Sequence, residues 1–255
     1  MKVTNMSKSK QPVLFISDVD DTLLGEPAAT RRLAHYLADE CAHELMIAYA
    51  SGRFFDSLKH DIENTDLPQP TYIIGGVGSD IRPFATGLSD EEWMRRMSDN
   101  WSAETIRMNL ADIEGLEIQP KADQSDFKVS YYYRDATAEQ LDQLRDRLAE
   151  AGIRAQLIYS SKRDLDFLPE NVNKGTAGCY LAQKLDIPLK RVISAGNSGN
   201  DITLMQHGFH GIVVGNADAE LRALAKDNDK IYVSAKTHAD GVVDGLRYWL
   251  KSFDA

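Results

Sequence analysis

The sequence is poor in cysteine and has no long apolar segment. Its two cysteines, Cys41 and Cys179, do not form a C-x-x-C pair, and both fall in stretches with helical spacing of apolar residues. We therefore expect thiols in a reducing compartment rather than a disulfide. No apolar run approaches the roughly 18 residues that a membrane span needs, and the one behind the N-terminal tail is too short for a signal peptide. These absences predict a cytoplasmic protein without a membrane partner.

Positive charge is also scarce, because 29 Lys and Arg are set against 39 Asp and Glu and leave a net charge of −10. Beyond the tail at 2–10, the sequence has no run of basic residues. This balance argues against nucleic acid and anionic membrane surfaces as partners. An acidic protein that handles an anionic substrate must instead concentrate positive charge locally, with a metal ion or with a few well-placed Lys and Arg.

Hydrophobic residues make up 43% of the chain, which suits one large domain or two moderate ones behind a disordered tail at 1–11. In the first third, short apolar strands alternate with helices: strands at 13–16, 45–50 and 72–74, helices at 30–40 and 54–62. The alternation returns after residue 173: helices at 174–185, 202–206, 217–225 and 242–250, strands at 192–195, 212–214 and 231–233. Nearly continuous apolar strands separated by helices indicate a parallel sheet covered on both faces.

The middle of the chain follows another plan. A charged helical stretch at 89–113, with a break predicted near Asn100, precedes a strictly alternating strand at 127–133. Thr137 and Gln140 form a capping box that opens a helix to Ala151, and a strand follows at 157–159. We therefore predict an α/β fold: a doubly wound parallel-sheet core at 12–83 and 169–255, interrupted by an α+β cap domain at 84–168.

Two carboxylates, Asp18 and Asp20, directly follow the strand at 13–16. Ligands of open α/β sheets bind at the carboxyl ends of strands, and two neighbouring carboxylates need a cation or a proton between them. A solvated turn is the alternative interpretation. An EF-hand is excluded, because its sixth and twelfth positions would be Leu23 and Ala29 instead of Gly and Glu.

Three more polar motifs follow core strands or open core helices. They are Ser51-Gly52-Arg53, Asn173-Lys174-Gly175 and the loop at 196–201. Taken singly, these are a common turn, a solvated lysine and an ordinary loop. Together with Asp18 and Asp20, however, these motifs indicate a catalytic site, because all of them fall in this order on one edge of a parallel sheet.

With these motifs the chain resembles the haloacid dehalogenase-like (HAD) phosphohydrolase superfamily, with the type IIB, or C2, cap. Within it, the sequence is most similar to sucrose-phosphate phosphatases and mannosylfructose-phosphate phosphatases. The segments that carry this resemblance are 15–23, 48–53, 75–79, 159–166, 212–216 and 239–242. The resemblance covers everything behind the tail and implies a Mg²⁺-dependent phosphatase.

The resemblance and the chemistry of the side chains imply the same roles. Asp18 is the expected nucleophile, and Asp20 is the expected general acid and base. Ser51 and Lys174 would contact phosphoryl oxygens and complete the catalytic set. The expected metal ligands are Asp18, Asp20 through its backbone carbonyl, Asn197 and Asp201, and the expected phosphate-binding residues are Ser51, Gly52, Lys174 and Asn200.

One position departs from the family pattern, because Asn197 stands where the fourth motif normally has Asp. An Asn carbonyl still ligates a hard cation, but one negative charge is missing. We therefore expect weaker Mg²⁺ binding or slower turnover than in a Gly-Asp relative. A working natural variant, a deliberate substrate-trapping substitution and a degenerate site all remain open.

Substrate recognition is expected in the cap and in the loop that leads to it. The candidates are Ser79, Asp80, Lys128, Tyr131, Lys162, Arg163, Asp164 and Asp166. Trp93 and Trp101 are expected to pack in the small core of the cap rather than to stack on a sugar ring.

The leading hypothesis is a phosphatase acting on a fructosyl disaccharide phosphate, with sucrose 6-phosphate first and mannosylfructose phosphate second. Such an enzyme would complete the synthesis of a compatible solute or storage sugar. We expect a monomer that associates with the synthase making its substrate. The alternatives are a phosphosugar mutase, which would keep the phosphate on the sugar, and a catalytically silent sugar-phosphate-binding protein, which only Asn197 favours.

Overall fold

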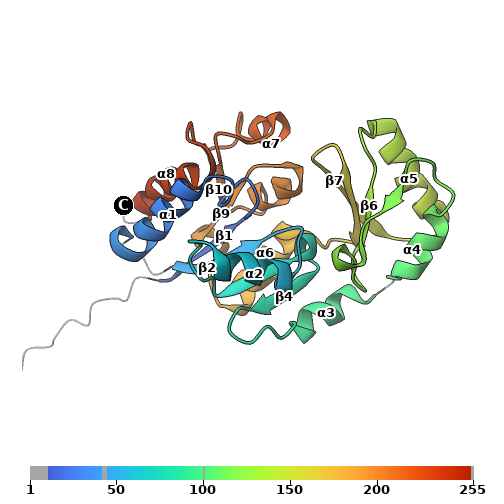
Figure 1. The fold of residues 1–255 in the computed structure, drawn as a ribbon, viewed down its shortest axis with the longest axis horizontal. Helices are drawn as coiled ribbons and strands as arrows, with labels where there is room; N and C mark the ends of the chain where they lie inside the picture. The colour runs from blue at the N-terminus through green and yellow to red at the C-terminus, as the bar shows by residue number, and fades with distance from the viewer. Residues whose placement is uncertain (1–10, 42–44, 100, 254–255) are drawn as a thin grey trace, which may run out of the picture.

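The computed structural model describes residues 11–41, 45–99 and 101–253 and divides them between two sheets. Figure 1 shows two lobes, one built on each sheet. The predicted tail at 1–11 lies almost wholly outside the described residues. No helix in the described ranges has the length and apolar character that crossing a bilayer requires.

The large sheet consists of β1 (Val13–Ser17), β2 (Leu45–Ala50), β3 (Tyr72–Gly75), β4 (Asp80–Pro83), β9 (Val192–Gly196), β10 (His210–Val213) and β11 (Ile231–Val233). Their order is β11-β10-β9-β1-β2-β3-β4, and every pair is parallel except β3 with β4. β1 is central and fully buried, as its unbroken apolar sequence predicts. The carboxyl ends of β1, β2 and β9 therefore meet at one edge of the sheet.

Helices cover both faces of this sheet. One face carries α1 (Pro27–His35), continued by the π-helical η1 (Tyr36–Glu40), together with α2 (Phe55–Asn64) and α8 (His238–Ser252). The other face carries α3 (Glu91–Met97), α6 (Lys174–Lys184), the 3-10 helix η5 (Gly199–Met205) and α7 (Ala219–Ala223). Alternate residues of β1 explain the division, because Phe15 packs with the first group and Ile16 with the second. The doubly wound α/β core is confirmed.

The small sheet is antiparallel and has the order β5-β6-β8-β7. Its strands are β5 (Glu117–Ile118), β6 (Val129–Tyr132), β7 (Ala155–Ser160) and β8 (Asp164–Pro169). Its outer face packs on α4 (Ala103–Leu110) and on α5 (Ala138–Glu150), which opens with the predicted capping box. Figure 1 shows these helices on the far side, so that the other face of the sheet is turned toward the core.

Several elements differ from the sequence prediction. The stretch at 89–113 forms two helices, α3 and α4, because Ser102 caps a new helix start by accepting from the backbone N–H of Thr105 at 3.2 Å. The predicted break at Asn100 falls on a residue outside the described ranges. The strands β4, β5 and β8 were not predicted, because they are short or contain Asp and Pro, which are uncommon in strands.

Trp93 does not pack in the core of the cap as expected. Its ring lies 4.9 Å from that of Tyr180 in α6, within the core cluster, whereas Trp101 does pack against the cap cluster. Helical spacing shows which residues of α3 are buried together, but not which lobe they pack against. The exact domain limits at 84 and 168 remain predictions.

Candidate active site

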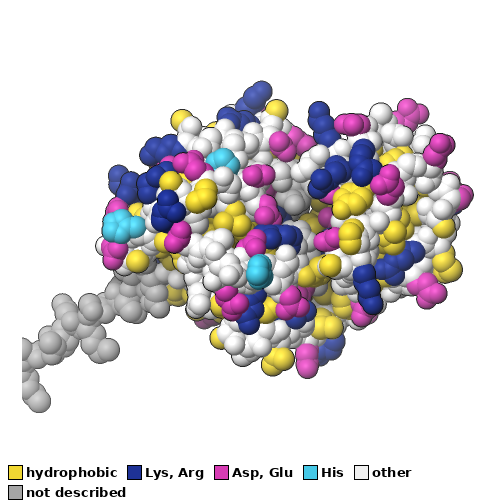
Figure 2. Space-filling view, viewed as in Figure 1, with side chains coloured by type: hydrophobic (Ala, Val, Ile, Leu, Met, Phe, Trp, Pro, Cys, Tyr) yellow, Lys and Arg dark blue, Asp and Glu magenta, His cyan; other side chains and the backbone are white. Residues whose placement is uncertain are grey.

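A cavity of about 340 Å³ lies between the carboxyl edge of the large sheet and the inner face of the small sheet. Figure 2 shows the surface hollowed between the two lobes, with acidic and basic side chains around the hollow. The residues that line the cavity are Asp18, Asp20, Asp21, Ser51, Gly52, Arg53, Gln119, Asp123, Lys128, Tyr132, Ser160, Ser161, Arg163, Asp164, Asp166, Asn197, Ser198 and Asn200. The cavity thus joins motifs from both halves of the core with residues of the cap.

Asp18 stands at the floor of this cavity, directly after β1. Its backbone N–H donates to the carbonyl of Ala195 at 2.9 Å, so the residue still follows the strand pairing of β1 with β9. The residue is 4% exposed, and one carboxylate oxygen accepts from the Lys174 ammonium at 2.7 Å. Lys174 is fully buried and donates also to Asp201 at 2.7 Å. The predicted nucleophile is therefore held by a buried cation at the first residue of α6.

Burial controls the charge of this pair. Burial and the neighbouring Asp201 raise the pKa of Asp18 to about 7, although Lys174 works in the opposite direction. Burial also disfavours the Lys174 ammonium, but the two carboxylates outweigh it and raise the pKa of Lys174 above its ordinary value. Lys174 therefore stays charged, while Asp18 changes charge near neutral pH unless another cation joins it.

Asp201 lies behind the cavity wall rather than in it. Its second carboxylate oxygen accepts the backbone N–H groups of Asn197 at 2.9 Å and Ser198 at 3.1 Å. The loop packs so closely that a Cβ on Gly196 would lie 2.5 Å from the Cβ of Asp201. Asp201 therefore shapes the loop that carries Asn197 and orients Lys174, and Asn197 itself reaches the cavity.

Asp20 is the second carboxylate and stands at the cavity rim, with 54% of its side chain exposed. It accepts from Arg53 Nε at 3.0 Å and from the Ser51 hydroxyl at 3.3 Å. Arg53 also binds Asp61 in α2 at 2.7 Å, which fixes the guanidinium against the core. The sequence analysis placed Arg53 within its motif but gave it no role. A basic residue one position after Ser51-Gly52 was the signal that could have found it.

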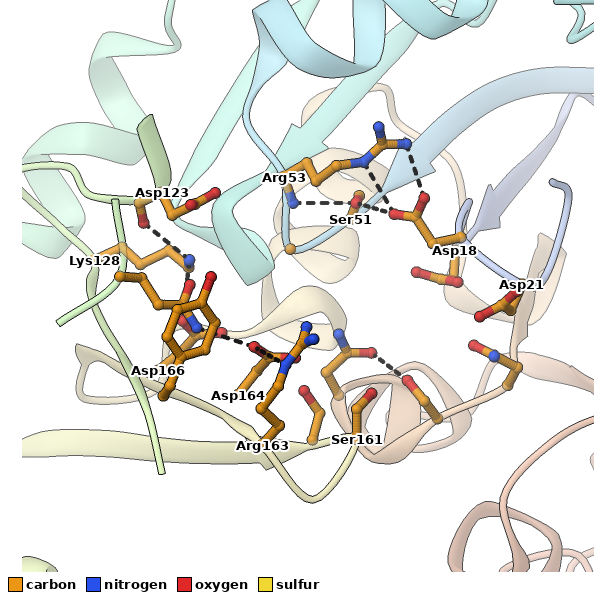
Figure 3. A pocket seen from close by; sticks show the side chains of 18 residues that line it. Asp18, Asp21, Ser51, Arg53, Asp123, Lys128, Ser161, Arg163, Asp164 and Asp166 are labelled. Atoms are coloured by element: carbon orange, nitrogen blue, oxygen red, sulfur yellow. Dashed lines mark hydrogen bonds and ion pairs between the residues drawn. The ribbon is translucent and has the colours of Figure 1, made fainter. Parts of the chain in front are cut away.

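The cap supplies the opposite wall. Lys128 is buried and donates to the Ser130 hydroxyl at 2.6 Å, to Asp166 at 3.0 Å and to the carbonyl of Asp123 at 3.2 Å. Arg163, which is more than half exposed, forms a two-point pair with Asp164. Figure 3 shows this mixed-charge group across the cavity from Asp18 and Arg53. Four of the six predicted cap residues, Lys128, Arg163, Asp164 and Asp166, thus come together.

Two predicted substrate residues near β4 do not reach the cavity. Ser79 is buried and donates to the carbonyl of Gly76 at 2.9 Å, so its hydroxyl stabilises a turn. Asp80 pairs with Arg82 at 2.7 Å within β4. The polar groups of both side chains are occupied by interactions with near neighbours in the sequence, which the sequence pattern did not reveal.

Tyr131 and Lys162 also lie outside the cavity. Tyr131 packs edge-on against Phe167, with 6.1 Å between the ring centroids, in the cluster between the cap sheet and its helices. Its neighbour Tyr132 lines the cavity instead, on the same face as Lys128. Strict alternation in the sequence separates these two faces, and Tyr131, the residue predicted to contact substrate, lies on the face that is turned away from the cavity. Lys162 lines an adjoining cavity.

The donor set suits a hard cation. In the described residues no three His, Cys, Asp or Glu side chains are grouped as a metal site, so carboxylates alone do not build one. However, the second carboxylate oxygen of Asp18 receives no hydrogen bond from the described chain, and Asn197, whose side chain carries an amide oxygen, lines the same cavity. Asn197 already accepts from the Thr22 hydroxyl at 3.2 Å, which holds that oxygen in place. A buried carboxylate with raised pKa and an amide oxygen fit Mg²⁺.

Comparison with known proteins decides the family. The sequence model of the family described as sucrose-6F-phosphate phosphohydrolase matches residues 11–250. The chain belongs to this family. The resemblance to sucrose-phosphate phosphatases within the HAD superfamily is confirmed.

Individual members of the sucrose-6F-phosphate phosphohydrolase family support this. The chain is 34% identical to a mannosylfructose-phosphate phosphatase of Agrobacterium fabrum, over 92% of this chain and 96% of that protein. The structure resembles the sucrose-phosphatase of Synechocystis sp. in complex with sucrose and phosphate, with a TM-score of 0.86, 32% identity, and coverage of 93% and 97%.

More distant relatives show the limits of the likeness. A probable sucrose-phosphatase of Arabidopsis thaliana is 26% identical over 93% of this chain, but the match spans only 59% of that protein. A HAD subclass IIB sugar phosphatase shares the fold, with a TM-score of 0.68 at 14% identity, over 93% of this chain and 98% of the other.

Proposed function

We propose that this family member is a phosphatase that hydrolyses the phosphate ester of a fructosyl disaccharide. The observation that carries the proposal is the buried Asp18 at the cavity floor, paired with Lys174 at 2.7 Å and open to the cavity on its other oxygen. The family membership and the names of the Agrobacterium and Synechocystis relatives support the substrate class. Sucrose 6-phosphate is the first candidate and mannosylfructose phosphate the second.

The side chains suit a two-step transfer. Asp18 attacks phosphorus, and the bond between phosphorus and the sugar oxygen breaks as the aspartyl-phosphate forms. Asp20 gives its proton to the departing sugar oxygen, then takes a proton from the water that attacks the phosphorus of the aspartyl-phosphate. This second step returns Asp18 as a carboxylate and releases inorganic phosphate. Ser51, Lys174 and the backbone at Gly52 hold the phosphoryl oxygens.

Asn200 supports the same phosphoryl group. Its amide oxygen accepts from Lys174 at 3.1 Å and from the Ser198 hydroxyl at 3.0 Å. With the oxygen occupied on this side, the amide NH₂ is left as the group that can donate to a phosphoryl oxygen. Asn200 is therefore proposed as a phosphate-binding residue.

We propose Mg²⁺ as the cofactor, held by Asp18, Asn197 and the backbone carbonyl of Asp20. The ion supplies charge neutralisation at the phosphoryl oxygens. Asp201 contributes indirectly in this proposal, because both of its carboxylate oxygens already accept hydrogen bonds. Its part is to hold the loop of Asn197 and the Lys174 ammonium.

The cap wall suits a sugar. Lys128, Arg163, Asp164 and Asp166 offer donors and acceptors side by side, and hydroxyl groups of a sugar need both. Tyr132 joins them as a ring surface with a polar end. A monomeric state and an association with the synthase that makes the substrate stay predictions.

The test is phosphate release from a panel of sugar phosphates that includes both disaccharides, with Mg²⁺ titrated. Release from a fructosyl disaccharide phosphate, with monosaccharide phosphates much poorer, is the expected result. Movement of the phosphate on the sugar without release would support a mutase instead. Binding of the disaccharide phosphate without any turnover would support the silent binding protein that Asn197 keeps open.

Asn197→Asp is expected to increase the affinity of the site for Mg²⁺. The added charge beside Asp18 should lower the Mg²⁺ concentration for half-maximal activity by about tenfold, because ligand charge tunes the affinity of oxygen sites. The measurement is a Mg²⁺ titration of phosphate release by both proteins. An unchanged or higher half-maximal concentration would remove Asn197 from the proposed metal shell.

Stabilisation by Mg²⁺ is expected to depend on pH. The pKa of Asp18 is raised to about 7, so its contribution to stability is present at low pH and is lost as pH rises from about 4 to 7. Mg²⁺ competes with the proton for this carboxylate and should restore stability where Asp18 is ionised. We expect saturating Mg²⁺ to raise the Tm more at pH 8 than at pH 5, by about 4 °C.

Thermal unfolding with and without Mg²⁺ at both pH values makes this measurement. The same experiment on Asp18→Asn provides the control, because that variant should lose the difference between the two pH values. An equal rise in Tm at pH 5 and pH 8 in the parent chain would place the ion away from Asp18.

A further inference from the structure

Helix α3 belongs by sequence to the inserted segment, yet it packs on the core. Trp93 and Met97 lie in the hydrophobic cluster under the large sheet, where the ring of Trp93 meets that of Tyr180. Figure 1 shows α3 beside β4, where the chain crosses toward α4. α3 is therefore a fixed part of the core at the base of the cap.

Asp90, the N-cap of α3, ties this helix to α6. Its carboxylate accepts hydrogen bonds from the Tyr180 hydroxyl at 2.8 Å, the Lys184 ammonium at 2.6 Å and the backbone N–H of Trp93 at 3.1 Å. Burial would raise the pKa of Asp90, but these donors outweigh it and lower the pKa. Asp90 therefore stays ionised and keeps Trp93 against α6.

Trp93 also holds an unusual turn. Its indole N–H donates to the carbonyl of Gly78 at 2.9 Å, and this hydrogen bond is buried. Gly78 ends the turn Gly76–Gly78, in which three successive residues have positive φ values of 55°, 59° and 108°. The middle residue is Val77, whose β-branched side chain makes this conformation costly. Such a turn persists only where its surroundings hold it.

One side of this turn supports the strand end that carries Ser51. The backbone N–H of Val77 donates to the carbonyl of Ser51 at 2.9 Å, and that of Gly76 donates to the carbonyl of Arg53 at 3.0 Å. A displacement of the turn would therefore move the Ser51–Arg53 loop, which lines the cavity.

The other side of the turn abuts the start of α6. A Cβ on Gly78 would lie 2.4 Å from the carbonyl of Asn173 and 2.9 Å from the backbone nitrogen of Lys174. Lys174 is the residue whose ammonium binds Asp18. The turn thus fills the space between Ser51 and Lys174, two of the groups assigned to phosphoryl oxygens.

We propose that Trp93 is a positioning residue for phosphoryl transfer: its indole N–H pins the Gly76–Gly78 turn, which holds Ser51 and Lys174 at the spacing the phosphoryl group requires. This inference rests on the proposed phosphatase function. Without the N–H, a buried carbonyl loses its partner and the strained turn is free to shift. Displacements of about 1 Å in an active site can cost about 100-fold in rate.

Trp93→Phe tests this, because phenylalanine keeps a ring against Tyr180 but cannot donate. We expect kcat to fall about tenfold, since the turn keeps its other hydrogen bonds. The loss should be the same for a fructosyl disaccharide phosphate and for p-nitrophenyl phosphate, which offers no sugar to the cap. The inhibition constant of inorganic phosphate should rise severalfold, which loss of stability alone would not produce.

Tyr180→Phe is the matched control. It removes the hydroxyl that binds Asp90 but leaves the Lys184 ion pair and the Trp93 indole hydrogen bond in place, so the Tm should fall while kcat and phosphate inhibition stay unchanged. If Trp93→Phe lowers only the Tm, or if Tyr180→Phe lowers kcat as much, the positioning role is wrong.

Gly78→Ala changes a residue of the same turn and places its Cβ against the backbone at the start of α6. We expect it to give the same losses of kcat and of phosphate affinity. It keeps the inference testable if Trp93→Phe does not fold. A parent chain that releases no phosphate would contradict the proposed function. An active parent with an unaffected Trp93→Phe variant would contradict the positioning role alone.

Discussion

Asp18→Asn is expected to abolish phosphate release, with kcat lower by about 10⁵-fold, as loss of a catalytic nucleophile typically costs. The amide has the same shape but cannot form the acyl-phosphate bond. Substrate affinity should be kept or improved, because one negative charge near the phosphoryl group is gone. Steady-state phosphate release and equilibrium binding of the disaccharide phosphate measure the two effects separately.

The same substitution should leave the fold at least as stable. Asp18 is buried and its pKa is raised to about 7, so at pH 8 the folded protein bears the cost of an ionised, desolvated carboxylate. Asn removes that cost, and the Tm without Mg²⁺ should not fall. Asp56→Asn, on the exposed side of α2, is the control and should change neither activity nor Tm. Activity above about 1% of the parent would contradict the assignment of Asp18 as nucleophile.

Lys174→Met is expected to damage both activity and stability. Lys174 is the cation that binds Asp18 and Asp201, each at 2.7 Å, and all three side chains are nearly or fully buried. Removing it leaves two buried carboxylates facing each other, which should lower the free energy of unfolding at pH 8 by about 3–5 kcal/mol. kcat should fall about 10³-fold, as expected for loss of a charge that stabilises the transition state.

The stability of Lys174→Met should recover partly at pH 5. There the unpaired carboxylates can take up protons, since burial already raises the pKa of Asp18 in the parent chain. Urea unfolding at both pH values tests this. Lys184→Met, at the other end of α6, removes an ion pair that is 41% exposed on the lysine side and should cost about 1 kcal/mol. Equal losses for the two variants would mean that the buried pair has no special role.

The candidate catalytic motifs were accessible to prediction because each is local in sequence. Asp18 follows an unbroken apolar strand, and parallel strands bring their carboxyl ends to one edge of a sheet. That rule alone brings Asp18, Ser51 and Asn197 to one cavity. The predicted capping box of α5 likewise depends on residues three positions apart.

The cap residues were less accessible, because an alternating strand has two faces and the pattern does not say which one meets the core. Tyr131 faces the cap helices and Tyr132 faces the cavity, since α4 and α5 cover only one side of the small sheet. Ser79 and Asp80 do not line the cavity for another reason. Their polar groups are satisfied by close neighbours, Gly76 and Arg82, and are not available to a ligand.

The sequence by itself determined the doubly wound core, the strand ends that carry the chemistry and the family, because periodicity and short motifs act within a few residues. Only the tertiary structure decided that Trp93 joins the core, that Arg53 binds Asp20, and that burial raises the pKa of Asp18 to about 7. Each of these depends on groups distant along the chain and on the exclusion of water between them. Burial and long-range contact are properties of the packed chain, which no local pattern specifies.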